Sequence, residues 1–353
     1  MPSAKRKTEG GSTFRRVTMK DIAVRVGVSI NTVSKALTNK PDISSRTKEL
    51  VFKAAHDLGY AYEVVTKSWA LRKTRVVGLL IADNSNPFFS KVVKGVEATL
   101  QQHGYALILC NTNEDYAREK SAIEVLVNQG VDGIILTPVQ SRDEDIAYLL
   151  SKKTPFVLLG RHFSSYNVPS VISSDRDGAY RAVDHLLRLG HTRILFLNAY
   201  HHISSAEERL EGYQAAHRDN GIEPDPALVR YSDPKMESTY NELKSVLLEG
   251  LDFSAIFTFS DMMMLGVIRL LHEKGIAVPH DLSIIGFDDI DFVSLLTPPL
   301  TTVSQDTFRL GSESALLLIR MINGEQPEGI TRVVPTRLVI RGSTARRSNP
   351  SPM

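Results

Sequence analysis

The sequence predicts a multidomain protein, in which a small all-α unit of three helices precedes a larger α/β domain built from two similar lobes. Between residues 17 and 60, apolar side chains recur with helical spacing. From Val76 onward, near-continuous apolar runs alternate with amphipathic segments, which is typical of buried parallel strands covered by helices. The first half of this region is echoed in the second half, with glycines nine residues apart at Gly95 and Gly104 and again at Gly212 and Gly221.

Charge is distributed unevenly along the 353 residues. Residues 1–75 contain 16 Lys and Arg against 6 Asp and Glu, a balance of +10, and the remaining 26 basic and 34 acidic residues give residues 76–353 a balance of −8. A basic module joined to an acidic domain indicates a protein that contacts phosphate groups through one of its parts. We expect residues 1–16, rich in Lys, Arg, Gly and Ser, to form a disordered basic arm that either attracts nucleic acid or is simply a solvated tail.

The N-terminal unit opens with a helix-turn-helix pattern. A first helix over residues 20–25 places Ile22, Ala23 and Val26 on one face, and Gly27 supplies a residue able to adopt positive φ after it. Ser29 is a natural N-cap for the second helix. A third helix is expected from a cap at Ser44 to an end at Gly59, with five residues packed against the other two helices: Leu50, Val51, Ala54, Ala55 and Leu58.

The second helix separates a buried stripe from an outward face. Val33, Ala36 and Leu37 have the spacing of the buried stripe. The outward face then holds Ile30, Asn31, Ser34 and Lys35. Asn can pair with adenine, Lys can donate to guanine, and Ile can contact a thymine methyl group, so this face suits the major groove of DNA.

The run "VTMKDIAVRVGVSINTVSKALTNKPDISSRTKELVFKAAHDLGY" closely resembles the DNA-binding headpiece of the lactose-repressor (LacI/GalR) family of bacterial transcription regulators. The resemblance implies a helix-turn-helix DNA-binding domain over residues 17–60. The residues expected to contact DNA in this domain are Thr18, Ser29, Ile30, Asn31, Thr32, Ser34, Lys35, Thr38, Ser44 and Thr47.

Residues 61–75 form a basic, amphipathic linker. In the family that the headpiece resembles, this segment is a hinge that inserts apolar side chains into the minor groove. Here Trp69 stands where the inserted Leu is usual, with Leu71 displaced by two residues as a rival, and Tyr62 and Glu63 replace the usual Pro and Asn. We expect either Trp69 or Leu71 to enter the groove, or both to pack on the following domain.

The α/β domain is expected to span residues 76–343, with a flexible tail over 344–353. The runs "VVGLLIA", "YALILCN", "VDGIILT" and "PFVLLG" read as strands buried on both faces, and "TRILFLNA", "FSAIFTF" and "LSIIGFD" echo them. Two such halves resemble the periplasmic sugar-binding proteins and the effector domains of the same family. We expect a homodimer and leave a tetramer open. The tail has no heptad pattern, which disfavours a coiled-coil helix for tetramer formation.

Side chains at the ends of the strands predict a ligand site between the lobes. Ligands of doubly wound sheets bind beyond the carboxyl ends of the strands, and two facing halves create a cleft there. The expected effector-binding residues are Asn86, Phe88, Phe89, Arg161, Ser205, Arg209, Asp261 and Asp288. The aromatic pair could stack on a sugar or belong to the core, while Arg and Asp suit vicinal hydroxyls. By resemblance, Ile203 stands where purine-binding members have an Arg, which disfavours a purine. A sugar or sugar acid is favoured only by its frequency in the family, and the identity of the ligand stays open.

The sequence lacks the motifs of the enzyme classes that we considered. It contains no Gly-x-Ser-x-Gly elbow, phosphate-binding loop or His-Glu-x-x-His, and we expect no catalytic residues, metal ligands or cofactor. The single Cys110 is expected to be buried, and with no apolar signal segment or run of 18 apolar residues, the protein is expected in the cytoplasm without membrane contact.

These features predict a repressor whose affinity for double-stranded operator DNA is controlled by a small effector. Release of DNA on effector binding is the commoner arrangement in the family, although the sequence itself leaves release or recruitment open. Two alternatives from other classes are a solute-binding transport component and a sugar-acting enzyme. The first would need an export signal and the second a catalytic constellation, and neither is evident.

Overall fold

A computed structural model describes residues 17–38, 40–58, 60, 73–325, 327 and 330–347. The chain divides into two compact units, residues 1–72 and residues 73–353, and each is treated separately. Trp69 and Leu71, the predicted minor-groove residues, lie outside the described part of the chain, as do the predicted N-terminal arm and residues 348–353 of the predicted tail.

The first unit consists of three helices, α1 (Met19–Val26), α2 (Ile30–Leu37) and α3 (Ser45–Asp57). Their shared core is formed by the predicted stripes: Ile22, Ala23, Val33, Ala36, Leu37, Val51, Ala54 and Ala55. The prediction was wrong for Leu50, whose side chain is 52% exposed. The adjacent Val51 occupies the core position instead, because it shares a helix face with Ala54 and Ala55. Gly59, the predicted helix end, is outside the described residues.

The ends of these helices are fixed by local hydrogen bonds. Thr18 and Asp21 form a reciprocal capping box at the start of α1, and Gly27 ends that helix with a φ of 73°. The Ser29 hydroxyl accepts a hydrogen bond from the Thr32 amide at 3.0 Å, as the N-cap prediction requires. The turn between α1 and α2 is therefore set by a left-handed glycine followed by a capping serine.

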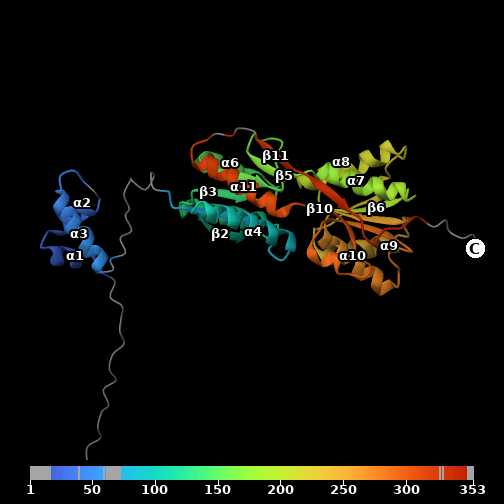
Figure 1. The fold of residues 1–353 in the computed structure, drawn as a ribbon, viewed down its shortest axis with the longest axis horizontal. Helices are drawn as coiled ribbons and strands as arrows, with labels where there is room; N and C mark the ends of the chain where they lie inside the picture. Colours follow the sequence, from blue (N-terminus) through green and yellow to red (C-terminus); the bar gives the residue numbers. More distant parts are fainter. Residues whose placement is uncertain are drawn as a thin grey trace, which may run out of the picture. The chain divides into compact units, whose positions relative to one another are not determined.

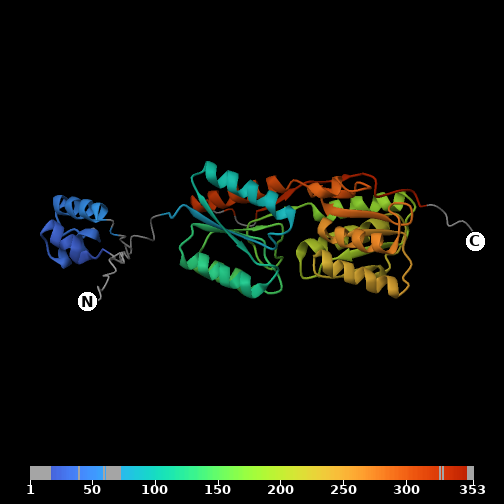
Figure 2. The ribbon, with the colours of Figure 1, turned by 90° about the horizontal axis from the view of Figure 1, so that it is seen from below.

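The second unit contains two six-stranded sheets, as the internal near-repeat predicted (Figures 1 and 2). The strands of the first sheet are, in spatial order, β11 (Thr331–Val334), β5 (Ser170–Ser173), β4 (Phe156–Leu159), β3 (Gly133–Leu136), β1 (Val76–Ile81) and β2 (Ala106–Asn111). Those of the second are β12 (Thr336–Val339), β10 (Thr301–Gln305), β9 (Ser283–Asp288), β8 (Ala255–Thr258), β6 (Ile194–Asn198) and β7 (Val229–Tyr231).

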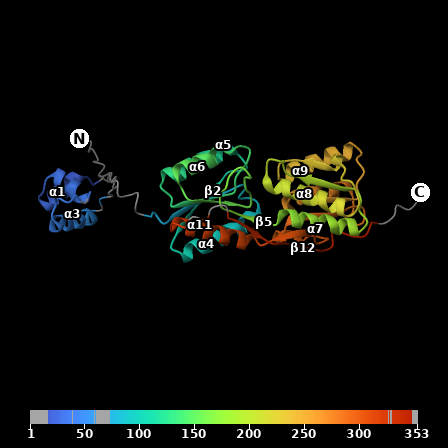
Figure 3. The ribbon, with the colours of Figure 1, turned by 90° about the horizontal axis from the view of Figure 1, so that it is seen from above.

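Every strand pair is parallel except β10 with β12. Helices cover both faces of each sheet, and Figure 3 shows α5 and α6 on one side of the first sheet with α4 and α11 on the other. The helices are α4 (Pro87–Gln102), α5 (Tyr116–Asn128), α6 (Glu144–Lys152), α7 (Asp175–Arg188), α8 (Ser204–Asp219), α9 (Met236–Leu248), α10 (Asp261–Lys274) and α11 (Thr307–Ile322). Short 3₁₀ turns occupy Pro226–Leu228 and Asp291–Ser294.

The chain crosses between the lobes at three places. β5 leads into α7, β10 leads into α11, and β11 leads into β12, each time passing from one lobe to the other. The crossings are bonded to one another, since the Ser173 hydroxyl donates to the Gln305 side chain and the Thr336 hydroxyl donates to the Ser174 carbonyl. This bundle of crossings joins the lobes at one edge of the space between them.

The prediction that "YALILCN" is buried on both faces was wrong. It forms β2, the edge strand of the first sheet, where Ile108 and Leu109 are 41% and 46% exposed. Cys110 is accordingly half-buried rather than buried. An edge strand has a neighbour on one side only, so apolar composition alone does not guarantee burial.

The paired glycines lie where helices cross closely. A Cβ on Gly95 of α4 would come 2.1 Å from the Phe308 carbonyl oxygen of α11, and one on Gly212 of α8 would come 2.2 Å from the Arg176 carbonyl oxygen of α7. The two lobes thus use the same glycine-mediated helix contact. Gly104 and Gly221 follow these helices with φ values of 73° and 71°.

We predict that Gly95→Ala lowers the free energy of unfolding by about 1–3 kcal/mol, because the added methyl group must push two helix backbones apart. Urea denaturation followed by circular dichroism measures the change. Lys94→Ala, at an exposed position of the same helix, is the control and should leave the midpoint in place. An unchanged midpoint for Gly95→Ala would contradict the close packing of α4 on α11.

Both predicted ends of the α/β domain need adjustment. The Thr74 amide donates to the Asp132 carboxylate at 2.7 Å, and the Arg75 amide donates to the same group at 3.0 Å. At the other end the Ala345 amide donates to Ser283, and the Arg347 amide donates to the Leu189 carbonyl. Residues 74–75 and 344–347 therefore belong to the folded domain rather than to a linker and a tail. No helix among the described residues is long and apolar enough to cross a membrane.

Candidate functional site

The outward face of α2 carries the side chains that the sequence assigned to base contacts. Ile30 is 49% exposed and Asn31 is exposed, while Ser34 and Lys35 are half-buried. The Lys35 ammonium donates to the Asp42 carboxylate at 2.6 Å, and this hydrogen bond lowers the pKa of Asp42. Sequence reasoning missed Asp42, because it lies seven residues away in the connection to α3, beyond helical spacing.

Hydroxyl groups gather at the starts of the headpiece helices. The Ser29 and Thr32 hydroxyls are 2.8 Å apart at the start of α2, and the Ser44 and Thr47 hydroxyls are 2.8 Å apart at the start of α3. Free amide groups and hydroxyls at helix N-termini suit phosphate oxygens. Thr38 differs, because its hydroxyl donates to the Ser34 carbonyl at 2.8 Å.

A cavity of about 70 Å³ lies in the second unit, between the two lobes. It is smaller than the roughly 300–1,000 Å³ of pockets for drug-sized ligands, so it suits a small molecule. Seven of the eight predicted effector residues line it: Asn86, Phe88, Phe89, Arg161, Ser205, Arg209 and Asp288. Residues predicted from the strand ends therefore form much of the cavity wall.

Phe88 and Phe89 form the aromatic part of the wall. Asn86 caps α4 by accepting a hydrogen bond from the Phe88 amide, and this fixes both rings at the helix start. The ring centroids are 5.0 Å apart and the rings are nearly perpendicular. Phe89 belongs to the core of the first lobe, whereas Phe88 packs against the cores of both lobes. The core alternative is therefore confirmed for Phe89, and both rings also line the cavity, while stacking on a sugar remains a prediction.

Each cavity arginine is neutralised by a carboxylate. The Arg161 guanidinium donates to both oxygens of Glu114, at 2.9 and 2.5 Å, and to the Pro138 carbonyl at 2.7 Å. Arg209 donates from Nε to Asp175 at 2.7 Å and also to the Phe259 carbonyl. Because these arginines are buried and paired, they would bind a ligand through hydrogen-bond donors in fixed positions rather than through an unpaired charge.

Arg209 is the more enclosed of the two cavity arginines. Its guanidinium carbon lies 4.3 Å from the ring centroid of Phe259 and 3.6 Å from that of Phe287, so the cation is stacked on two aromatic rings. Its partner Asp175 is 2% exposed, and burial raises the pKa of that carboxyl while the Arg209 charge opposes the rise. Asp175 and Arg209 are thus a buried ion pair at the cavity wall.

Asp288 ends β9 with strained backbone, at a φ of 121°. Its carboxylate accepts a hydrogen bond from the Gln305 amide at 2.7 Å, and burial raises its pKa to about 7. Gln305 lies at the crossing from β10 to α11 and also lines the cavity. Strain held at a strand end beside a cavity is typical of a binding position.

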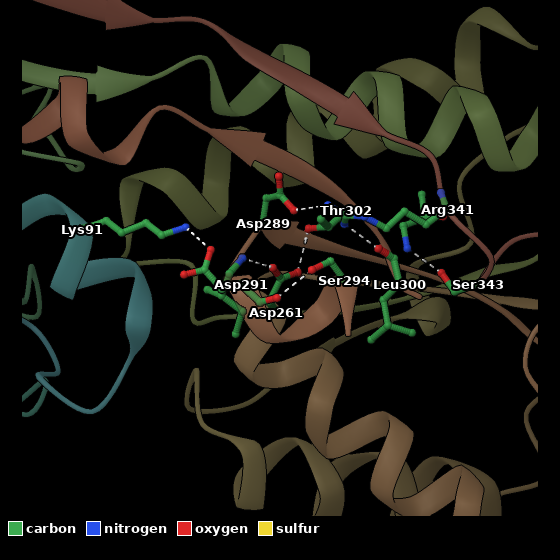
Figure 4. A network of polar contacts seen from close by, with 11 residues as sticks. Lys91, Asp261, Asp289, Asp291, Ser294, Leu300, Thr302, Arg341 and Ser343 are labelled. Carbon is green, nitrogen blue, oxygen red and sulfur yellow. Dashed lines mark hydrogen bonds and ion pairs between the residues drawn. The ribbon is translucent and has the colours of Figure 1, made fainter. Parts of the chain in front are cut away.

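Asp261, the eighth predicted effector residue, does not line the cavity. It is the first residue of α10 and fully buried. Its carboxylate accepts hydrogen bonds from the Ile290 amide at 2.9 Å and from the Thr302 hydroxyl at 2.7 Å. Figure 4 shows Asp261 and Thr302 side by side. Asp261 therefore ties the segment after Asp288 to β10, one layer behind the cavity wall.

Polar contacts cross from one lobe to the other beside the cavity. Lys91 of α4 donates to Asp291 of the second lobe at 2.6 Å (Figure 4). The Ser204 hydroxyl accepts a hydrogen bond from the His162 amide at 3.0 Å, and the Ser204 amide donates to the Gln140 side-chain oxygen at 2.9 Å. These contacts hold the lobes in the arrangement seen here.

Three further polar residues of the cavity were not among the predicted effector residues: Glu114, Asp175 and Gln305. Asp175 and Gln305 stand at the crossings between lobes, a topology that apolar periodicity does not reveal. Glu114 lies in the loop after β2, a strand end that the sequence search passed over. Among the described residues, no group of three or more His, Cys, Asp or Glu is arranged to hold a metal ion.

Two family profiles match the chain. Residues 18–62 match "Bacterial regulatory proteins, lacI family", and residues 74–341 match "Periplasmic binding proteins and sugar binding domain of LacI family".

Individual relatives match over nearly the whole length. The HTH-type transcriptional repressor CytR of Escherichia coli K12 is 32% identical over 93% of this chain and 96% of its own. The HTH-type transcriptional regulator GalR of the same strain is 32% identical over 94% and 96%. Among solved structures, the lac repressor dimer bound to operator and an anti-inducer has a TM-score of 0.71 at 28% identity, covering 94% of this chain and all of that one. A CelR–cellobiose complex has a TM-score of 0.71 at 30% identity over 93% and 100%.

Proposed function

Since the chain belongs to the LacI family and is a DNA-binding transcriptional repressor rather than an enzyme, we propose that a small, uncharged sugar binds between its lobes and sets its affinity for operator DNA. The single observation that carries this proposal is the cavity, where two aromatic rings face fixed carboxylate, guanidinium and amide groups. Aromatic faces suit the apolar side of a sugar ring, and fixed polar groups suit its hydroxyls.

The charge of the cavity favours a neutral sugar over a sugar acid. Its lining holds four carboxylates, Asp83, Glu114, Asp175 and Asp288, against three cations, Arg161, Arg209 and Lys235. Both guanidinium groups already pair with carboxylates. An added anion would find both guanidinium groups already paired, so neither is free to receive it. Solved relatives include complexes with cellobiose and with ribose, both neutral sugars.

A purine effector is the second candidate, because PurR repressors are among the relatives. Ile203, at the place of the Arg of purine-binding members, is 2% exposed and belongs to the core of the second lobe. It offers no polar group to a base, so we regard a purine as the weaker candidate.

The proposed control works through the arrangement of the lobes. A ligand shifts an equilibrium only when it binds one arrangement better than the other. Here the cavity takes residues from both lobes, so a sugar bound there favours the lobe spacing that fits it. We propose that this change passes to the headpiece through residues 61–73, and that operator affinity changes with it.

On the DNA side, we propose a homodimer that places two α2 helices in successive major grooves of a near-palindromic operator. The lac repressor among the neighbours is a dimer bound to operator. Ile30, Asn31 and Lys35 would contact bases, with Thr18, Ser29 and Thr47 on phosphates.

Asn31→Ala should weaken binding to the preferred sequence by about 1–3 kcal/mol while leaving non-specific binding nearly unchanged, because Asn contacts base edges. Ser29→Ala should instead weaken binding to all sequences alike, since it removes a phosphate contact and a helix cap. Fluorescence anisotropy with the preferred and a scrambled duplex, at one salt concentration, measures both. Equal losses on both duplexes for Asn31→Ala would remove it from the base-reading set.

A thermal-shift screen tests the effector proposal. A ligand that binds the native state alone raises the unfolding temperature with its concentration. We expect at least one neutral monosaccharide to raise it more than the matching sugar acid or the purine bases. A shift by purines and not by sugars would replace the sugar proposal with the second candidate.

A further inference from the structure

A pair of acidic residues, Glu119 of α5 and Asp145 of α6, is buried inside the first lobe. Glu119 is 0% exposed and Asp145 is 2% exposed, and their carboxyl groups lie against each other. Neither residue lines the cavity between the lobes.

The pair is short of hydrogen-bond donors. One Glu119 oxygen accepts the Val139 amide at 2.9 Å. The other oxygen and both oxygens of Asp145 make no hydrogen bond of normal geometry among the described residues, and only the Ile146 and Asp145 amides come near the Asp145 carboxylate. Two ionised carboxylates can only accept, so their mutual contact satisfies neither of them. The interior of a native protein seldom leaves three buried carboxyl oxygens without a hydrogen-bond donor.

A single proton supplies the missing donor. When two carboxylates are in contact, their like charges strongly raise the pKa of one of them, and burial raises it further. Burial, with the Asp145 charge second, raises the pKa of Glu119 to about 9. Asp145 lies in the first turn of α6, where the helix dipole favours the charged form. Glu119 therefore carries the proton and donates it to Asp145.

A metal cation fits the pair poorly. Hard cations such as Ca²⁺ take about six to eight oxygen ligands, far more than two carboxyl groups provide. Arg161, the nearest cation acting on Glu119, is already bonded to Glu114. The other ionisable groups acting on the pair are Asp143 before α6, Tyr116 of α5 and Tyr166 between β4 and β5.

The Val139 amide places the pair at the base of a functional segment, residues 137–140. Thr137 lines the cavity, and the Pro138 carbonyl accepts Arg161 at 2.7 Å. Gln140 accepts the Ser204 amide of the opposite lobe at 2.9 Å and donates to the His162 carbonyl at 2.7 Å. Four consecutive residues thus contact the cavity, its arginine, Glu119 and the second lobe.

We propose that Glu119 and Asp145 form a proton-binding site whose one shared proton fixes segment 137–140, and with it Arg161 and the contact between the lobes. Glu119 is then a positioning residue for effector binding. That last link rests on the proposed function, whereas the proton site itself needs neither effector nor DNA for its test.

The sign of the pH dependence follows from the raised pKa. The folded protein holds the Glu119 proton up to a higher pH than the unfolded chain, whose pKa is about 4.3. The stabilisation is therefore complete below that pH and is lost as pH rises toward about 9. Asp288 and Glu208 also titrate with pKa values of about 7, so the wild type must be compared with a variant that keeps both.

The experiment is urea unfolding of the full chain and of E119Q between pH 5 and 9. The Gln amide donates to Asp145 without a titrating proton. We expect the unfolding constant of the wild type to rise relative to that of E119Q by up to about tenfold per pH unit. E124Q, at an exposed position of α5, should follow the wild type at every pH. D145N should shorten the pH range over which the stability changes, because it removes the Asp145 charge while burial still raises the pKa of Glu119. This variant keeps the test available if E119Q does not fold.

Hydrogen exchange by mass spectrometry tests the positioning role. The protection of the peptide covering residues 137–140 should fall with pH in the wild type relative to E119Q measured at the same pH. Parallel unfolding profiles of wild type and E119Q would overturn the proposal. Stabilisation of the wild type but not of E119Q by sodium, potassium, magnesium or calcium chloride, at matched ionic strength, would also overturn it in favour of a cation.

Discussion

Replacing Arg209 by methionine should lower the free energy of unfolding by about 3–5 kcal/mol, the largest stability effect expected in the chain. Methionine keeps most of the volume between the Phe259 and Phe287 rings but removes the hydrogen bond and ion pair to Asp175 and the hydrogen bond to the Phe259 carbonyl. Asp175 is then a buried carboxylate without a cation. Urea denaturation followed by circular dichroism gives the free energy.

The pH dependence identifies the cause. Without Arg209, the main charge that opposes the effect of burial is gone, so burial raises the folded pKa of Asp175 above its unfolded value. The variant should therefore be most stable at acid pH and lose stability as pH rises. Adding Asp175→Asn should recover part of the loss at neutral pH, because the buried charge is gone.

Arg269→Met is the matched control. Arg269 also bonds a carboxylate, Glu237 at 2.9 Å, and lies over an aromatic ring, Tyr240 at 4.6 Å, but its side chain is 46% exposed. Exposed ion pairs contribute about 0–1 kcal/mol. Equal losses for Arg209→Met and Arg269→Met would show that burial of the first pair has no special weight.

The second large effect is expected on effector binding. Asp288→Ala should weaken binding of the stabilising sugar by about 1.5–3 kcal/mol, which is the cost of losing hydrogen bonds to a charged group. DNA affinity without sugar should stay in place, because Asp288 belongs to the second unit and the headpiece is intact. Isothermal titration calorimetry measures the affinity for the sugar, and fluorescence anisotropy measures the affinity for DNA.

Two further variants keep that result interpretable. Asp288→Asn retains a residue that tolerates the φ of 121° and should lose less affinity than Asp288→Ala. Asp289→Ala removes the neighbouring carboxylate, which bonds Arg341 at 2.7 Å and does not line the cavity. It should leave sugar affinity unchanged, and an equal loss there would place the effect in the loop rather than in Asp288.

Periodicity predicted the fold class because both units obey it. The stripe of Val33, Ala36 and Leu37 is buried as expected, and the glycine pairs mark equivalent helix contacts in the two lobes. Periodicity failed for Leu50, where two adjacent apolar residues competed for one core position. It also failed for β2, because sequence gives the composition of a strand but not its place at the edge.

The cavity was predicted in part, for a physical reason. The ends of parallel strands meet at one edge of a sheet, so Phe88, Arg161 and Asp288 could be placed there from the sequence. Asp175 and Gln305 could not, because they reach the cavity through chain crossings between the lobes. Asp261 shows the reverse error, since a strand-end carboxylate can also bind backbone amides behind the wall. The residues proposed for the minor groove, Trp69 and Leu71, lie beyond the described residues and remain predictions.

The most direct test is anisotropy titration of a labelled palindromic duplex, chosen by selection from a random pool, with the full chain in the presence and absence of the stabilising sugar. We predict specific binding whose affinity the sugar changes about 5–150-fold, which is the usual range of coupling between two sites. Asp288→Ala should remove this change. Tight binding of the duplex whose affinity is the same with and without a saturating sugar would contradict control of this repressor through the cavity.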